Sequence, residues 1–257
     1  MLSTISSYRM IATNLTRSLQ TTAKQPQVAR ESEYYLAKIS KIKNIKDFLA
    51  DRRVFSYAMK AYNLDDMVDA KAYMRKVLKE GIDEADSFAN KLTDPRFKEF
   101  AAAFNFARYG EATTVFERTR QGTVDRYVRN TLEVQVSESN AGAGMALYFQ
   151  RKAPEITSPY KILADKTLLK VVQTALGLDS TTSYMSVDRQ AELIQSKLKI
   201  ADLSDPAKLE KFIIRFSSMW DLQNGIGMTQ VPNITGNRQS TISTSLLQSL
   251  QRLKLGG

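Results

Sequence analysis

Apolar residues recur every three or four positions through most of the chain, a spacing typical of helices with one buried face. The clearest such stretch covers 45–64, and a second copy of it covers 159–178 without a gap, at a constant offset of 114. In both copies the spacing predicts a short helical turn and then an apolar helix of about eleven residues. The pattern therefore indicates an internal duplication built from helices.

The ends of this repeated helix carry matching capping residues. Asp51 and Asp165 stand just before it, where an Asp side chain can accept hydrogen bonds from free backbone N–H groups. Asn63 and Gly177 stand just after it, and these residue types best tolerate a left-handed backbone. A leucine follows each of them, which predicts a Schellman-type ending. We interpret both acids as structural caps.

The similarity extends beyond this stretch. Tyr-Tyr at 34–35 matches Tyr-Phe at 148–149, and Leu-Thr-Asp-Pro at 92–95 matches Leu-Ser-Asp-Pro at 203–206. Each quartet predicts a helix that opens with an Asp cap and a proline. One more helix per copy is predicted, at about 67–78 and 187–198. We expect an all-α fold, an internally duplicated helical bundle flanked by N- and C-terminal amphipathic helices.

The connection between the copies has three parts. Residues 107–122 are polar and are predicted to form an exposed excursion. Residues 123–138 return to helical spacing; the alternation of Leu132, Val134 and Val136 leaves a short strand open, and we favour helix. The Ala-Gly-Ala-Gly run at 141–144 indicates a kink, a loop or a close backbone approach, without the context of a phosphate-binding loop.

Both chain ends carry Ser-, Thr- and Gln-rich segments with a narrow apolar stripe. The helices predicted at 3–22 and 239–254 carry this stripe at Ile5, Tyr8, Ile11 (or Ala12), Leu15 and Leu19, and at Ile242, Leu246, Leu250 and Leu253. A narrow stripe suits a seam against one partner helix better than a wide core face. We therefore predict that protein interaction uses Ile5, Tyr8, Ile11, Leu15, Leu19, Leu246, Leu250 and Leu253, packed on one another or on neighbouring subunits.

These segments define the expected organisation. It consists of an N-terminal amphipathic helix at 1–26, a first helical repeat at 27–106, a linker and connecting helix at 107–144, a second helical repeat at 145–222, a linker at 223–238 and a C-terminal amphipathic helix at 239–257.

The amino-acid composition limits the kinds of reactive site that the chain can form. The 257 residues include no cysteine and no histidine, which excludes disulfides, thiolate metal sites, cysteine nucleophiles and histidine-based acid/base catalysis. The formal net charge of +10 favours anionic partners, but the cations are interleaved with acids. The densest basic stretch, at 38–46, fits a solvated face better than a nucleic-acid footprint. No apolar run is long enough for a transmembrane helix, and the first residues do not resemble a cleavable secretory signal.

Few side chains suggest a reactive site. Asp65, Asp66 and Asp69 could hold a cation, but they lack the regular ligand ladder of a calcium loop. The aromatic set Phe97, Phe100, Phe104 and Phe106 is interpreted as core, and Trp220 as core or interface. We expect no cofactor and no metal.

Several runs resemble a helical family of unknown function found in alphaproteobacteria and often encoded within flagellar gene clusters. The runs are Tyr-Tyr at 34–35, Phe-Leu-Ala-Asp at 48–51, Ser-Phe-Ala-Asn-Lys-Leu at 87–92, Asp-Pro-Arg-Phe at 94–97, Leu-Tyr-Phe-Gln-Arg-Lys-Ala-Pro at 147–154, Ile-Leu-Ala-Asp-Lys at 162–166, Val-Val-Gln-Thr-Ala-Leu-Gly-Leu at 171–178 and Asp-Pro-Ala-Lys-Leu at 205–209. The resemblance covers about 30–222. It implies no catalytic residues. Usual members carry a more acidic, glycine-poor helix where this chain has 141–144.

The terminal helices also resemble those of flagellar axial proteins, in which two terminal helices pair. Together the resemblances lead us to expect a non-enzymatic structural or assembly component of the bacterial flagellum, placed at the basal body, rod or hook. The expected partners are other flagellar proteins and a second copy of this chain, with no small-molecule substrate and no nucleic acid. The alternative is a cytosolic adaptor or export chaperone for a flagellar partner.

Overall fold

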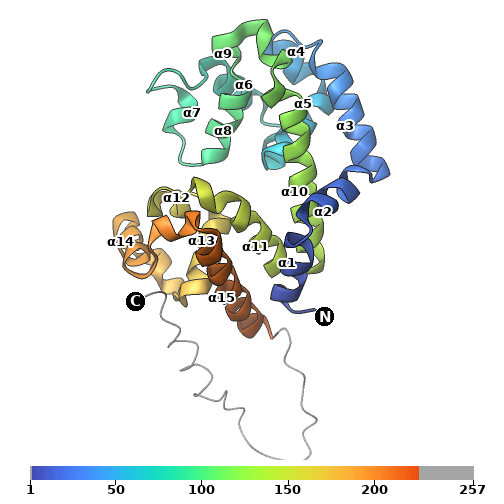
Figure 1. The fold of residues 1–257 in the computed structure, drawn as a ribbon. Coiled ribbons are helices and arrows are strands. Elements are labelled where there is room, and N and C mark those ends of the chain that lie inside the picture. Colours follow the sequence, from blue (N-terminus) through green and yellow to red (C-terminus); the bar gives the residue numbers. More distant parts are fainter. Residues whose placement is uncertain (1, 226–257) are drawn as a thin grey trace, which may run out of the picture. The chain divides into compact units, whose positions relative to one another are not determined.

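The computed structural model describes residues 2–225, which form α-helices and short 3-10 helices without a strand (Figure 1). The all-α prediction is therefore confirmed. The predicted C-terminal helix, with Leu246, Leu250 and Leu253, lies outside the described residues. Among those residues, no helix combines the length and apolar character needed to cross a membrane.

The two copies consist of corresponding helices. The chain up to the end of the first copy forms α1 (Thr4–Ala12), α2 (Leu15–Ala23), α3 (Pro26–Ile39), α4 (Ile45–Ala50), α5 (Arg52–Ala61), η1 (Asp65–Met67), α6 (Lys71–Glu80), α7 (Phe88–Lys91) and α8 (Pro95–Ala103). The connection forms α9 (Phe106–Tyr109), η2 (Gly110–Val115), η3 (Glu117–Thr119) and α10 (Gln121–Ser139). The second copy forms α11 (Ala141–Lys152), η4 (Ala153–Glu155), α12 (Pro159–Leu163), α13 (Lys166–Leu176), η5 (Ser180–Tyr184), α14 (Val187–Lys197), η6 (Ile200–Ser204) and α15 (Pro206–Asn224).

The predicted caps are present at both copies of the repeated helix. The Asp51 carboxylate accepts from the Val54 N–H at 3.0 Å, and Asp165 accepts from two N–H groups at the start of α13. Asn63 and Gly177 adopt φ values of 57° and 62°. The following Leu64 and Leu178 N–H groups donate back into α5 and α13 at 2.9 and 2.8 Å. Both Schellman-type endings are therefore confirmed.

Each copy has its own hydrophobic core, and equivalent positions fill them. Tyr35, Ile42 and Phe48 are buried in the first core, and Phe149, Ile156 and Ile162 take the same places in the second. The Phe97, Phe100, Phe104 and Phe106 side chains are buried in the first core as predicted. The duplication is thus visible in three dimensions as two cores with matched contributions.

The helix α10 belongs to both cores. Its N-terminal half contributes Val124, Tyr127 and Val128 to the first core, and its C-terminal half contributes Leu132 and Val136 to the second. It packs on α5 of the first copy and on α11 of the second. The prediction of a helix at 123–138 is confirmed, and this helix connects the two copies.

The N-terminal segment differs from the single helix predicted at 3–22. It divides at Thr13 and Asn14 into α1 and α2. The first of these packs on α11 and α15, and the second packs on α10 and α3 (Figure 1). Because of this break, the apolar stripe packs against both cores. A straight helix of the same length would not contact both.

Most of the polar segment 107–122 is exposed, as predicted, but three of its threonines are not. Thr113, Thr114 and Thr119 are buried. Their hydroxyls donate to backbone carbonyls, including Thr114 to Ile42 at 2.6 Å and Thr119 to Thr113 at 2.7 Å. The Tyr35 hydroxyl in turn donates to the Thr119 carbonyl at 2.6 Å. Threonine is a polar residue, but each of these buried hydroxyls has a hydrogen-bond partner. The hydrogen bonds with Ile42 and Tyr35 hold the segment against the first core.

The glycine-rich run at 141–144 is a close backbone approach at the start of α11. A Cβ atom on Gly142 would lie 2.4 Å from the Trp220 ring, and one on Gly144 would lie 1.7 Å from the Ser137 hydroxyl. Side chains at these positions would separate α11 from α15 and α10. Of the three interpretations left open by the sequence, the close approach is the correct one.

Candidate functional site

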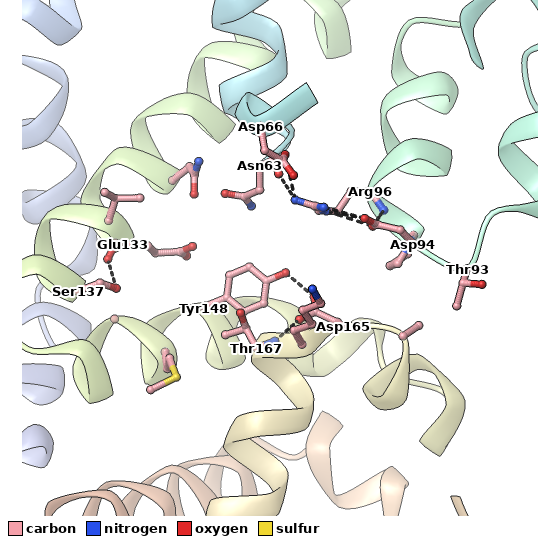
Figure 2. A pocket seen from close by; sticks show the side chains of 17 residues that line it. Asn63, Asp66, Thr93, Asp94, Arg96, Glu133, Ser137, Tyr148, Asp165 and Thr167 are labelled. Atoms are coloured by element: carbon pink, nitrogen blue, oxygen red, sulfur yellow. Dashed lines mark hydrogen bonds and ion pairs between the residues drawn. The ribbon is translucent and has the colours of Figure 1, made fainter. Parts of the chain in front are cut away.

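A pocket of about 610 Å³ lies between residues of the two copies. Its lining comes from the end of α5, the start of α8, the middle of α10, and the facing parts of α11 and α13 (Figure 2). The charged and polar side chains that define it are Asp66, Asp94, Arg96, Glu133, Tyr148 and Asp165. Asp94 and Asp165, which cap helices that the duplication repeats, therefore face the same cavity.

Asp165 uses its two carboxylate oxygens for different partners. One oxygen accepts from the Thr167 and Leu168 N–H groups at 2.8 and 3.0 Å, and the other accepts from the Tyr148 hydroxyl at 2.5 Å. Figure 2 shows Tyr148 and Asp165 pointing toward each other across the pocket floor. Burial, followed by the Asp165 charge, raises the pKa of Tyr148 well above its usual value. Tyr148 is therefore a protonated donor that holds α11 to the start of α13.

Arg96 organises the opposite wall of the pocket. Its guanidinium makes a bidentate contact with Asp94, with the shortest N–O distance at 2.7 Å. It also donates to the Asn63 carbonyl and lies 3.7 Å from Asp66. The hydrogen bond to Asp94 raises the pKa of Arg96 above its usual value. Arg96 thus ties the left-handed end of α5 to the start of α8, and a planar guanidinium suits this geometry.

Glu133 forms the back of the pocket and is 4% exposed. Its carboxylate accepts from Arg129 at 2.7 Å and from Arg151 in a two-bond contact at 2.8 Å. The Arg129 guanidinium also donates to the Leu147 carbonyl. A buried carboxylate is stable only when its charge is compensated, and here two arginines compensate it. This triad joins α10 to α11.

Of the three acids that could hold a cation, Asp66 and Asp69 have arginine partners. Asp66 lies beside Arg96, and Asp69 forms an ion pair with Arg52 at 3.0 Å. Within residues 2–225, no group of three or more acidic side chains is arranged to hold a metal ion. The pocket's carboxylates therefore have defined roles in joining helices, as caps or as partners of arginines.

The predicted interaction stripe at the N-terminus packs against the chain's own core. Tyr8 is 3% exposed in the second core, and Ile5, Ile11 and Leu15 are partly buried against the same core. Leu19 contacts both cores. The helices α1 and α2 bring these five residues together with the duplicated bundle. Their use in binding a partner stays a prediction, as does that of Leu246, Leu250 and Leu253 beyond the described residues.

Sequence reasoning did not identify Tyr148, Arg96 or Glu133 as linking residues. One signal was available for Tyr148, because the pair Tyr148 and Asp165 stands at the same spacing as Tyr34 and Asp51. In the first copy, however, Tyr34 lies 3.8 Å from the Arg53 guanidinium, so the repeat alone does not predict the contact. Arg96 and Glu133 each have one partner close in sequence, but the contacts that join helices, Arg96 to Asn63 and Glu133 to Arg151, are distant in sequence and have no local signal.

Comparisons with known proteins agree with the duplicated helical fold. A family model described as a protein of unknown function, DUF1217, matches residues 61–209. A crystal structure of a protein from Agrobacterium tumefaciens, determined as a structural genomics target, shares 44% sequence identity and superposes with a TM-score of 0.81. That similarity covers 87% of this chain and 97% of the other. A search of curated proteins finds no significant match. The chain therefore belongs to the DUF1217 family of proteins of unknown function.

Proposed function

We propose that this protein is a non-enzymatic structural or assembly component of the bacterial flagellum that acts through helix–helix protein interactions. The observation that supports this proposal most directly is the role of the repeated acids. Asp51 and Asp165, the best placed candidates for chemistry, both cap the helix that the duplication repeats. The duplication thus preserves a scaffold, and the helical surfaces of a scaffold are suited to protein recognition.

The proposed location in the cell rests on the resemblance of this chain to a known family. The runs described above are similar to a family often encoded within flagellar gene clusters, and the expected site is the basal body, rod or hook. The expected partners are other flagellar proteins and a second copy of this chain.

A cytosolic adaptor or export chaperone is the second candidate, and one observation favours it. The N-terminal stripe, which would pair with other helices in an axial protein, instead covers the chain's own cores. An adaptor would bind its flagellar partner through outer surfaces of the folded bundle. The two candidates differ in where the protein resides, on the flagellum or in the cytoplasm.

The decisive experiment uses the full chain, because removal of 1–22 would delete Tyr8 from the second core. A strain without the gene is compared with one that carries the chain with a small C-terminal tag. We expect loss of motility and defective basal bodies in the first strain, and tagged protein in purified basal bodies in the second. Normal flagella and motility without the gene would refute a flagellar role.

The same tagged strain separates the two candidates. A structural component should co-purify with basal bodies and depend on the flagellar export apparatus for its position. An adaptor should stay in the cytoplasmic fraction and bind its partner there. A strain that lacks the export apparatus is the control for both fractions.

A further inference from the structure

One corner of the first copy carries four exposed lysines within nine residues. Lys38, Lys41, Lys43 and Lys46 lie at the end of α3, in the turn after it and at the start of α4. We call these four residues the basic corner. Within residues 2–225, the ion pair found here is between Lys43 and Glu111, at 3.5 Å and largely exposed. An exposed pair of this kind contributes little to stability.

The duplication provides an internal comparison for this corner. At the offset of 114, the second copy has Lys152, Glu155, Thr157 and Tyr160 at the four positions. Lys152 is buried there and contacts Glu99 at 2.5 Å, while Glu155 is acidic and exposed. The same turn between equivalent helices therefore forms without four exposed lysines. The fold does not require the basic corner, so its charge is available for binding.

The backbone of the basic corner is held in place. Ile42 is buried in the first core, and its carbonyl accepts from the Thr114 hydroxyl at 2.6 Å. Asn44 caps α4 by accepting from the Asp47 N–H at 2.9 Å, and its amide donates to the Asp47 carboxylate at 2.8 Å. The lysines thus project from a fixed turn, which reduces the backbone entropy lost when a partner binds.

The segment 107–122, in which Thr114 and Glu111 contact the turn of the basic corner, has residue types that favour protein partners. Val115 follows Thr114 directly and is 54% exposed. The Arg118 guanidinium lies 4.4 Å from the Phe116 ring and 4.7 Å from the Tyr109 ring. Arginine and aromatic side chains are enriched in protein–protein interfaces. Glu111 lies within this surface and pairs with Lys43. A protein segment can place carboxylates on the other lysines and an uncharged side chain beside Glu111, whereas a phosphate backbone carries a charge at every step.

We propose that the basic corner and Val115 form a docking surface for an acidic segment of a partner protein. Carboxylates of the partner face the lysines, and an apolar side chain of the partner contacts Val115. The inference deepens the proposed function and rests on it only in taking the partner to be a protein. Nucleic acid and an anionic lipid surface are treated as outcomes of the test.

The test replaces three lysines with the residues that the second copy has at the same positions. The variant Lys41→Glu/Lys43→Thr/Lys46→Tyr changes the charge by −2, −1 and −1. The matched control Lys197→Glu/Lys211→Glu changes it by −2 and −2, at exposed lysines of the second copy. Both full-length variants should melt like the wild type, because every altered side chain is exposed.

The probe is a fluorescein-labelled peptide of glutamates with interspersed leucines, titrated by anisotropy. We expect the three-lysine variant to raise the Kd by about tenfold, and the control to change it by less than about twofold, since remote exposed charges are screened. A peptide with glutamine in place of glutamate should not bind. Failure of the wild type to bind the glutamate peptide, or equal weakening by both variants, would overturn the proposal.

Two further probes identify the class of partner. A short DNA duplex and phosphatidylglycerol vesicles should bind more weakly than the glutamate peptide and should not discriminate between the two variants. Tighter binding of either probe, lost in the three-lysine variant, would overturn the proposal in favour of nucleic acid or lipid. Co-purification with basal bodies is scored separately. If the protein co-purifies with basal bodies but does not bind the peptide, the docking surface alone is refuted. If it binds the peptide but does not co-purify with basal bodies, the flagellar setting alone is refuted.

Discussion

At the scale of single residues, Asp165 shows how a cap can acquire a second role. Both Asp51 and Asp165 hold the start of the repeated helix, but only Asp165 also accepts from a tyrosine, Tyr148. The two aspartates are therefore a natural pair for measuring what the additional contact contributes. Asp165 differs from Asp51 by the Tyr148 contact and by one further cap hydrogen bond, so their comparison measures these two contacts together.

Asp165→Ala is expected to lower the free energy of unfolding by about 2 kcal/mol, because it removes a cap and leaves the Tyr148 hydroxyl without its acceptor. Asp51→Ala, the matched control, should lower it by about 1 kcal/mol, the usual effect of a lost cap. Urea unfolding followed by circular dichroism measures both. Equal losses would show that the Tyr148 contact adds nothing to stability.

Tyr8 gives the fold a dependence on alkaline pH. Burial, followed by the Glu210 charge, raises the pKa of Tyr8 from 10.0 to about 12 in the folded protein. A group whose pKa is higher in the folded than in the unfolded protein stabilises the fold. Its contribution to the free energy of unfolding is present below the unfolded-state pKa and is lost as the pH rises through the folded-state pKa. The stability contribution of Tyr8 is therefore complete below pH 10 and decreases between pH 10 and about 12.

In Tyr8→Phe the free energy of unfolding should therefore decrease less between pH 10 and about 12 than in the wild type, because phenylalanine has no proton to lose. The measurement is the urea midpoint at several pH values from neutral to about 12. Tyr184→Phe, at a tyrosine that is 91% exposed, is the control and should follow the wild type. A Tyr8→Phe profile parallel to the wild type would contradict the assignment.

At the scale of elements, the local signals were predictable and the distant partners were not. The caps at Asp51 and Asp165 and the left-handed residues Asn63 and Gly177 act within one turn of their own helix, so the sequence identifies them. The break at Thr13 and Asn14 depends on two cores that form elsewhere in the chain. The pocket residues Arg96 and Glu133 likewise depend on contacts between helices, which periodicity does not specify.

The close approach of α11 to its neighbours depends on glycine. Gly142→Ala places a methyl group against the Trp220 ring and should lower the free energy of unfolding by about 1–3 kcal/mol, the usual effect of overpacking. Trp220→Leu in the same chain should recover part of this loss, because it removes the ring atoms nearest to the new methyl group. Thermal melting of both single variants and the double variant measures the coupling. Additive losses would contradict the contact.

At the scale of the whole described molecule, the two copies share structure and should unfold together. The helix α10 lies in both cores, and Leu19 contacts both. Disruption of one core therefore removes packing from elements that the other core needs. The duplicated halves are expected to form one cooperative unit.

Phe48→Ala in the first core tests this expectation. The side chain is fully buried, and its removal should cost about 3–5 kcal/mol. Trp220, the one tryptophan of the chain, lies against the second core and reports on that core by fluorescence. We expect the Trp220 transition to shift together with the circular dichroism signal. Phe149→Ala in the second core is the reciprocal variant, and two separated transitions in either variant would contradict the cooperative unit.

The contact between Thr4 and Asp221 has a consequence for synthesis of the chain. The Thr4 N–H donates to the Asp221 carboxylate across a sequence separation of 217 residues, and α1 packs on the late helices α11 and α15. A ribosome adds about 5–20 residues per second, so about 10–40 seconds pass before the last of these partners, α15, exists. Until then Ile5, Tyr8 and Ile11 have only an incomplete core to cover. The first helix therefore reaches its final place only after α15 has been synthesised, and a chaperone bound to it until then would cover its apolar side chains.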